Sequence, residues 1–334
     1  MRTKIILLVI FSLLFLYGCT ANQTTDNQTQ VTCNAPYIRF GTSCCLDQNN
    51  NQICDTDENT PAKKPPPKTN TQPQTSMPTE SPPATTNDLS YSKGTCPTLK
   101  NGENDNFASD GLQRRFVLNL PSNPSGAPVL FVWHGSGGSP TNALNIKNRM
   151  MIGRENIIFV APYASGNSPL EWFSDAPAEN NADLLLFDDI LACLHTQYAI
   201  DLNRIWTTGF SAGAGWSSYL VVNRANRLAS AVILSGGLAT PDLYKTPAAK
   251  IPVLIEWGGP TDIAGVHNNE QASLSFSQQL QDDGNFVIEC KGNQGHTVGS
   301  DIRYTWTFLR DHPKGGTLEN YANGLPSEFP SYCK

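Results

Sequence analysis

Gly209-Phe210-Ser211-Ala212-Gly213 is the stretch of sequence that decides the fold. It fits the pattern G-x-S-x-G, follows a strand-like run at 204–208 and opens a helix-like run at 211–223. A tight turn between a strand and a helix is the context in which this pattern presents a serine hydroxyl at the top of a sheet. The turn strains the serine backbone, and the flanking glycines avoid collisions with the neighbouring strand and helix. We therefore expect Ser211 to be a nucleophile at a helix N-terminus; the alternative is a simple Gly- and Ser-rich loop.

Strand-like and helix-like runs alternate along residues 93–334, which are long enough for one α/β domain. The inner strand-like runs are almost continuously apolar, as expected for strands covered on both faces. This alternation predicts a mostly parallel, doubly wound sheet. The strand-like runs are 115–120, 129–133, 157–161, 204–208, 231–235, 253–257 and 286–290, and the helix-like runs are 142–153, 183–198, 211–223, 270–283 and 301–311.

A glycine-rich turn, His134-Gly135-Ser136-Gly137-Gly138, follows the strand-like run at 129–133. It resembles the H-G-x-G-G oxyanion motif of esterases and lipases. Glycines let backbone N–H groups point inward without obstruction by side chains. We expect the N–H groups of Ser136 and Ala212 to form an oxyanion hole. The alternative is an ordinary glycine-rich turn between a strand and a helix.

The acid and the base are expected after later strands, because reactive groups in such sheets lie at the carboxyl ends of strands. We expect Asp262, which follows the tight turn Gly258-Gly259-Pro260, to be the acid. Glu256 in the preceding strand is the alternative acid, but a position within the strand more naturally faces a helix or a polar partner. We expect His296, which lies in a loop after the run at 286–290, to be the base. Four other histidines compete for this role. These are His134, His195, His267 and His312.

Residues from about 96 to 333 resemble the polyhydroxyalkanoate-depolymerase and feruloyl/acetylxylan-esterase group of secreted hydrolases. The resemblance is carried by His134-Gly-Ser-Gly-Gly138, by Asp201 through Gly213, and by Gly295-His296-Thr297. It implies an α/β-hydrolase fold and acyl transfer through Ser211, Asp262 and His296, which follow the chain order of that fold. It implies no cofactor for catalysis. The sequence departs from the group at 214–216 and after Thr297, so the choice among polyester, feruloyl and acetyl-polysaccharide substrates stays open.

Four tryptophans near predicted strand ends or loops could stack on an aromatic acyl group or a sugar, or could simply belong to the core. We expect Trp133, Trp216 and Trp257, together with His134, to contact substrate; Trp172 is the fourth tryptophan. Two rival functions are a catalytically inactive, tethered binding or adhesion protein and a peptidase of the same fold. The net charge of −6 argues against a nucleic-acid partner.

The N-terminal residues 1–18 have the features of a signal peptide, with Arg2 and Lys4 before an apolar run that is too short to span a membrane comfortably. The run ends in Leu16-Tyr17-Gly18-Cys19, which resembles the lipobox of bacterial lipoproteins. We expect Cys19 to be lipidated and to anchor the protein to a membrane, although Tyr17 departs from the usual pattern. The alternative is an ordinary secretory signal, and both interpretations place the protein outside the cytoplasm.

Lipidation of Cys19 would leave eight of the nine cysteines for disulfides, as expected in an oxidising compartment. We expect residues 19–58 to form a small cysteine-rich module in which Cys44 and Cys45 take Cys33 and Cys54 as partners, in an order that is left open. Residues 59–92, rich in Pro and Thr, predict a disordered linker. Among the later cysteines we favour the pairs Cys96–Cys193 and Cys290–Cys333 over the other two connectivities.

A candidate calcium loop lies in the cysteine-rich module. Oxygen-bearing side chains are spaced as in a twelve-residue EF-hand loop, with the carbonyl of Ile53 at the seventh position. Gln52 stands where that pattern needs glycine, so the alternative is a solvated Asn/Asp loop. The candidate side-chain ligands are Asp47, Asn49, Asn51, Asp55 and Glu58.

Overall fold

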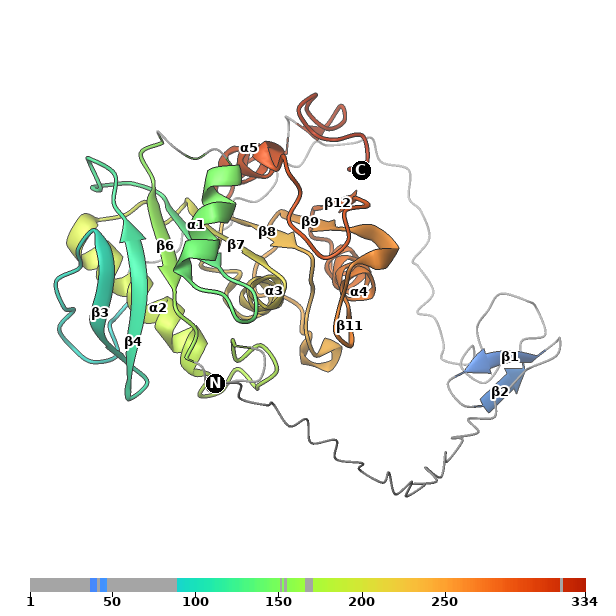
Figure 1. Cartoon of the computed structure of the whole chain (residues 1–334), viewed down its shortest axis with the longest axis horizontal. Coiled ribbons are helices and arrows are strands. Elements are labelled where there is room, and N and C mark those ends of the chain that lie inside the picture. Colours follow the sequence, from blue (N-terminus) through green and yellow to red (C-terminus); the bar gives the residue numbers. More distant parts are fainter. Residues whose placement is uncertain are drawn as a thin grey trace, which may run out of the picture. The chain divides into compact units, whose positions relative to one another are not determined.

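The computed structural model describes residues 37–40, 43–46, 89–150, 152, 155–165, 171–318 and 321–334. The chain divides into two compact units, Met1–Met77 and Pro78–Lys334 (Figure 1). In the first unit, strands β1 (Tyr37–Phe40) and β2 (Ser43–Leu46) form an antiparallel pair. The predicted signal peptide, Cys19, the candidate calcium loop and most of the predicted linker lie outside the described residues, so the predicted domain boundaries stay predictions.

The second unit is built on an eight-stranded sheet in the order β12-β9-β8-β7-β5-β6-β4-β3 (Figure 1). The six strands from β12 to β6 run parallel to one another, while β4 and β3 are antiparallel to their neighbours. This is the mostly parallel sheet that the alternating pattern predicts. The strands are β3 (Gly102–Ser109), β4 (Leu112–Asn119), β5 (Val129–Trp133), β6 (Ile158–Pro162), β7 (Ile205–Phe210), β8 (Ser230–Leu234), β9 (Val253–Trp257) and β12 (Val287–Lys291).

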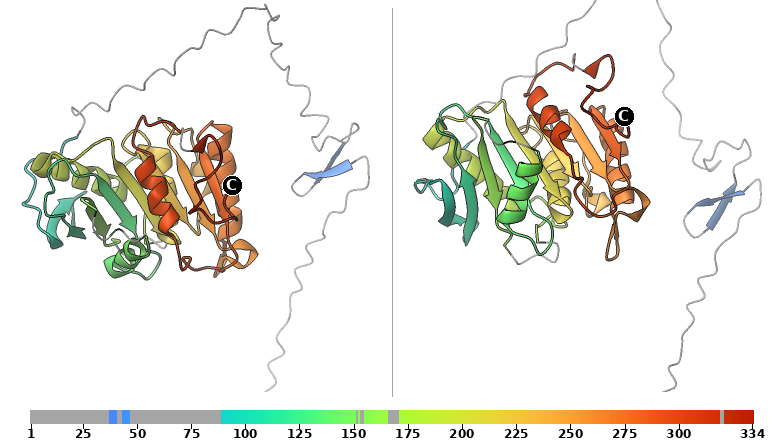
Figure 2. Two further views of the ribbon diagram at one scale, coloured as in Figure 1. Left: turned by 90° about the horizontal axis from the view of Figure 1, so that it is seen from above. Right: turned by 45° about the horizontal axis from the view of Figure 1, so that its top comes forward.

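Helices cover both faces of the sheet, as Figure 2 shows. Successive residues of a strand point to opposite faces, so β5 contributes Phe131 to one core and Val132 to the other. The first core includes residues of α2, α3 and α4, and the second includes residues of α1 and α5. The helices are α1 (Pro140–Arg149), α2 (Ala182–Tyr198), α3 (Ala212–Arg224), α4 (Asn269–Asp282) and α5 (Arg303–Asp311).

The sequence pattern does not predict two of the β elements. Strand β3 is rich in polar residues and lies at the edge of the sheet, where it pairs only with β4 and its register shifts between Asn104 and Phe107. Such a strand lacks the continuous apolar run that marks a buried parallel strand. The second element is a short hairpin of β10 (Ile263–Ala264) and β11 (His267–Asn268), whose two-residue strands are too short to give a periodic signal.

Two disulfides tie the ends of the second unit to its core, and both are the predicted pairs. Cys96–Cys193 joins the segment before β3 to α2, and Cys290–Cys333 joins β12 to the C-terminal tail. The tail also pairs with the edge of β12, because the N–H and carbonyl groups of Glu289 and Lys334 exchange hydrogen bonds of 3.0 and 2.9 Å. None of the helices in the described ranges is long and apolar enough to cross a membrane.

Candidate active site

Ser211 occupies the turn between β7 and α3, as expected from the five-residue motif. Its backbone has φ 57° and ψ −121°, a conformation that L-residues rarely adopt, and its N–H donates to the carbonyl of Leu234 at 3.1 Å. A Cβ on Gly209 would collide with the backbone of Gly213, and a Cβ on Gly213 would collide with the backbone of Trp133. The turn therefore needs both glycines, and it holds the serine hydroxyl above the end of the central strand.

Ser211, His296 and Asp262 form one chain of hydrogen bonds. His296 Nε2 lies 2.9 Å from Ser211 Oγ, and His296 Nδ1 lies 2.7 Å from Asp262 Oδ1. The three residues follow β7, β12 and β9, parallel strands whose carboxyl ends meet at one edge of the sheet. The structure thus brings together three side chains that are separated by 85 and 34 residues in the sequence.

Asp262 is fully buried and is surrounded by hydrogen-bond donors. Its Oδ2 accepts from the backbone N–H of Gly258 at 2.8 Å, and its Oδ1 accepts from Asn269 Nδ2 at 3.3 Å. Burial by itself would raise the pKa of Asp262, but hydrogen bonds from His296, Gly258 and Ser235 outweigh it and lower the pKa. An ionised carboxylate can only accept hydrogen bonds, so Nδ1 of His296 carries the proton and Nε2 is left to accept from Ser211.

The glycine-rich turn packs directly against the serine turn. A Cβ on Gly135 would lie 3.2 Å from both the Phe210 carbonyl and Ser211 Cβ. The N–H of Gly137 donates to Glu171 Oε1 at 3.0 Å, and the N–H of Gly138 donates to the Gly135 carbonyl at 3.0 Å. Ser136 is the residue of this turn that lines the pocket beside Ser211, together with Ala212. Both predicted oxyanion residues therefore lie at the pocket wall.

A pocket of about 520 Å³ opens beside Ser211. Its walls are made of mostly small, uncharged side chains from α3, the loop after β8, the β10–β11 hairpin and the first turns of α4, and His267 is the one acidic or basic side chain in this lining. The residues that line it are Ser136, Ser174, Ser211, Ala212, Gly215, Gly236, Gly237, Leu238, Ala239, Pro241, Ala264, Val266, His267, Asn268, Asn269, Gln271, Ala272 and Ser275.

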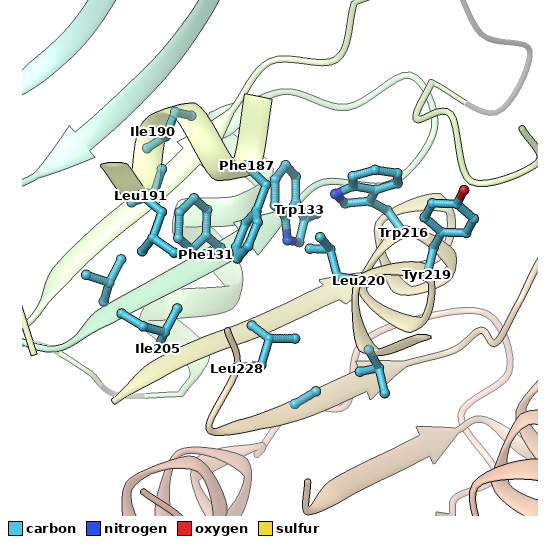
Figure 3. Close-up of a cluster of buried hydrophobic side chains, with 14 of the residues drawn as sticks. Phe131, Trp133, Phe187, Ile190, Leu191, Ile205, Trp216, Tyr219, Leu220 and Leu228 are labelled. Atoms are coloured by element: carbon cyan, nitrogen blue, oxygen red, sulfur yellow. The ribbon is translucent and has the colours of Figure 1, made fainter. Parts of the chain in front are cut away.

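The tryptophans and His134 do not line this pocket, so their predicted contact with substrate stays a prediction that the pocket lining does not support. Trp133, Trp216 and Trp257 are at most 1% exposed, and His134 is 1% exposed. Trp133 packs edge-on against Trp216 within the core shown in Figure 3, and its indole N–H donates to Thr207 Oγ1 at 2.9 Å. Aromatic side chains at strand ends can face the core or the cleft, and here the large apolar surface is buried in the core.

His134 has a role in the glycine-rich turn. Its Nδ1 lies 2.9 Å from the Gly135 carbonyl, and its ring stacks obliquely on Trp172 at 4.9 Å. Burial lowers the pKa of His134. Of the remaining histidines, His195 lies in α2, His312 follows α5 and is buried, and His267 lies in the hairpin at the pocket. Only His296 contacts both Ser211 and Asp262 among the described residues.

Three polar residues lie near the site without being predicted members of it. Two of them were not identified from the sequence, and the third, Glu256, was considered only as an alternative acid. Asn269 and Ser235 both act on Asp262, and no motif marks either of them. Glu256 faces polar partners, as expected, and takes no part in the contact with His296: its two oxygens accept from Tyr304 and Gln294. Burial raises the pKa of Glu256 despite those two hydrogen bonds. Within the described ranges, no group of three His, Cys, Asp or Glu side chains is arranged to hold a metal ion.

Two feruloyl esterases are similar in sequence to part of the chain. Feruloyl esterase D of Neurospora crassa is 28% identical over 151 residues, which are 43% of this chain and 52% of that protein. The probable feruloyl esterase C of Aspergillus terreus is 29% identical over 155 residues, which are 43% of this chain and 53% of that protein. The chain thus spans about half the length of these curated relatives. No family model matches the chain.

Solved structures with the same fold cover most of the chain. The native structure of sOPH is 20% identical and covers 72% of this chain and 96% of its own, with a TM-score of 0.58. The native structure of pOPH is 19% identical, with the same coverage and a TM-score of 0.59. At this level of identity the likeness concerns the fold. The chain has the α/β-hydrolase fold, and the predicted resemblance to feruloyl esterases is confirmed by sequence similarity.

Proposed function

We propose that this protein is a serine esterase that hydrolyses carboxylic esters. The observation that carries the proposal is the continuous hydrogen-bond chain from Ser211 Oγ through His296 to the buried Asp262, beside an open pocket. This arrangement has the roles of a nucleophile, a base and a group that orients the base. The similarity to two proteins named as feruloyl esterases supports the same class of reaction.

In the proposed acylation step, Ser211 Oγ attacks the ester carbonyl while His296 Nε2 takes the hydroxyl proton. Asp262 fixes the tautomer of the imidazole and stabilises the imidazolium that forms. The backbone N–H groups of Ser136 and Ala212 donate to the oxyanion of the tetrahedral intermediate. Loss of one such donor typically costs on the order of a hundredfold in rate. His296 then returns the proton to the leaving alcohol, and an acyl-enzyme remains.

Deacylation repeats the same chemistry with water. His296 removes a proton from a water molecule that attacks the acyl carbonyl, the oxyanion forms again at the same donors, and the proton returns to Ser211 as the acid product leaves. The carboxylate of Asp262 is suited to this role because its hydrogen bonds keep it ionised. These residues supply every proton transfer in the two half-reactions.

The pocket favours an uncharged substrate group. Small residues surround Ser211, and acidic and basic side chains other than His267 are missing from the lining that the structure describes. A feruloyl, acetyl-polysaccharide or polyester carbonyl is compatible with that lining, and the two similar proteins are named for feruloyl esters. A panel of an aryl acetate, a feruloyl ester, acetylated xylan and a short polyester, with rates compared as kcat/KM, distinguishes these substrates.

Substitution of Ser211 by alanine tests the proposed reaction. Ser211→Ala should remove ester hydrolysis almost entirely, because the hydroxyl is the attacking group, and should leave the melting temperature nearly unchanged. A serine-directed phosphonate should label the wild type at Ser211 and should not label the variant. Labelling of the variant at another serine, or full activity without the hydroxyl, would show that Ser211 is not the nucleophile.

We also propose that the enzyme works outside the cytoplasm and is anchored by lipid at Cys19. Two disulfides in the second unit support an oxidising compartment. Mass spectrometry of the N-terminal peptide tests the lipid, and an unmodified or uncleaved N-terminus would contradict it. The calcium loop with Asp47, Asn49, Asn51, Ile53, Asp55 and Glu58 stays a prediction, for which calcium titration of the full chain is the measurement.

A further inference from the structure

Glu256 is a buried acid that the proposed reaction does not use. It lies in β9 and is only 2% exposed. In the parallel register of the sheet it is paired with Cys290 of β12. It does not line the pocket beside Ser211. A buried carboxylate persists only where hydrogen bonds compensate the loss of water, so its partners indicate its role.

The two oxygens of Glu256 are divided between two segments. Oε1 accepts from Gln294 Nε2 at 3.1 Å, and Oε2 accepts from the Tyr304 hydroxyl at 2.6 Å. Gln294 precedes His296 by two residues in the loop at 292–300, which we call the histidine loop. A Cβ on Gly299, near the end of this loop, would lie 3.1 Å from Glu256 Oε1. The carboxylate therefore binds the histidine loop at Gln294 and lies close to it at Gly299.

The histidine loop has no helix or strand of its own and depends on such anchors. Two backbone bonds fix its first half, Gly292 N–H to the Trp257 carbonyl at 2.8 Å and Gly295 N–H to the Gly258 carbonyl at 3.0 Å. Arg149 of α1 donates to the Val298 carbonyl at 2.8 Å in its second half. Gln294 itself accepts from the Asn293 N–H at 3.0 Å, so its amide is held at both ends. A displacement of the base by about 1 Å can cost on the order of a hundredfold in rate.

We propose that Glu256 is a positioning residue that holds the histidine loop, and through it His296, in register with Ser211 and Asp262. The same carboxylate anchors α5 through Tyr304, and Tyr304 contacts Tyr332 of the C-terminal tail. Glu256 thus joins the histidine loop and α5 to the end of β9, and through Tyr304 it is linked to the C-terminal tail. The inference rests on the proposed esterase function, because its effect is read out at His296.

An exchange of donor and acceptor tests this role. Gln294→Glu places a carboxylate opposite the Glu256 carboxylate and breaks the contact. Glu256→Gln offers one neutral acceptor oxygen where the carboxylate offers two charged ones, so it cannot accept from both Gln294 and Tyr304, and it weakens the contact. The double variant restores it, because the new amide at position 256 donates to the new carboxylate at position 294 and still accepts from Tyr304, while that carboxylate still accepts from the Asn293 N–H. We expect kcat for an aryl ester to fall at least tenfold in Gln294→Glu and by less in Glu256→Gln, with KM little changed. The double variant should recover at least threefold in kcat relative to Gln294→Glu.

The controls separate positioning from folding and from the proposed function. Gln278→Glu makes the same chemical change at an exposed position of α4, and it should keep wild-type kcat. If a Glu256 variant does not fold, Gln294→Ala at the partly exposed partner should still lower kcat tenfold at an unchanged melting temperature. Wild-type kcat in Gln294→Glu, or a double variant that does not recover relative to it, would overturn the inference. A wild type that hydrolyses no ester and resists the phosphonate would instead overturn the proposed function.

Discussion

Asn269 shows how one side chain outside the motifs can complete the site. Its Nδ2 donates to Asp262 Oδ1 at 3.3 Å and lies 3.0 Å from His296 Nδ1. Its backbone N–H donates to the Asp262 carbonyl at 2.9 Å. Because Nδ1 of His296 already carries the proton that it shares with Asp262, the amide of Asn269 acts on the carboxylate. It is therefore a further hydrogen-bond donor that keeps Asp262 charged and aligned.

Replacement of Asn269 by alanine should lower kcat about tenfold with little change in KM. A hydrogen bond to a charged group contributes about 1.5–3 kcal/mol, and this one is long, so the lower end of that range applies. Asn269→Asp should cost more, because it places a second carboxylate beside the first. Asn226→Ala, the same truncation at an exposed position, is the control and should keep full activity. Wild-type kcat in Asn269→Ala would show that Asp262 does not need this donor.

Residue by residue, the sequence allows prediction of the groups that belong to motifs. Ser211 and His296 are identified by glycine-rich turns and by chain order, and Asp262 by a turn after a strand. The contribution of Asn269 could not be predicted, since it depends on how the first residue of α4 returns over Asp262 after the hairpin. The burial of the tryptophans could not be predicted, because neither a position at a strand end nor one in the helix after the serine determines which face an indole occupies.

At the level of elements, α3 presents a glycine to the pocket where most helices carry a side chain. Gly215 lines the pocket in the first turn of α3, and a Cβ there would lie 3.3 Å from the Gly237 carbonyl and 3.9 Å from Ser174 Oγ. Gly237 and Ser174 also line the pocket. A larger side chain at position 215 would therefore grow into the space beside Ser211.

Substitution at Gly215 should change substrate size preference more than stability. Gly215→Leu should lower kcat/KM for a bulky ester at least tenfold more than for an acetyl ester, because the side chain fills part of the pocket. Gly215→Ala adds only the Cβ and serves as the graded control, with a smaller effect; alanine in place of glycine inside a helix favours the helix by up to about 1 kcal/mol. Equal losses for both esters would mean that Gly215 does not border the substrate.

The elements themselves follow from local pattern where burial is complete. The apolar run at 253–257 matches β9, and the helix predicted at 183–198 begins one residue later than α2 and ends with it. Predicted boundaries are less accurate where a turn sets the end of an element. The helix predicted at 142–153 is α1 at Pro140–Arg149, and it begins two residues earlier because Ser139 is its N-cap and Pro140 its first residue. Strand β3 and the hairpin were missed because edge and two-residue strands depend on partners that a local pattern does not reveal.

For the whole molecule, the two disulfides join the ends of the second unit to its interior. Cys96–Cys193 spans 97 residues and Cys290–Cys333 spans 43 residues, so each closes a long loop in the unfolded chain. Cys290 of β12 and Cys193 of α2 are fully buried, whereas Cys333 of the tail is 9% exposed. The C-terminus lies beside β12 in Figure 1, where the tail covers the open edge of the sheet.

Removal of the Cys290–Cys333 disulfide should destabilise the protein without stopping the reaction at low temperature. A loop of this length contributes about 2–4 kcal/mol through the unfolded state, which corresponds to a fall in melting temperature of roughly 5–15 °C for a domain of this size. At 10–20 °C (roughly the temperature of maximum stability), the backbone bonds between Glu289 and Lys334 and the contact of Tyr332 with Tyr304 should hold the tail. Both effects are measured in the double variant Cys290→Ser/Cys333→Ser by thermal unfolding and by aryl-ester hydrolysis at several temperatures.

Peptide mass mapping of the non-reduced wild type is the control for the Cys290–Cys333 disulfide. Activity lost equally at all temperatures would mean that the tail holds the histidine loop through the disulfide itself.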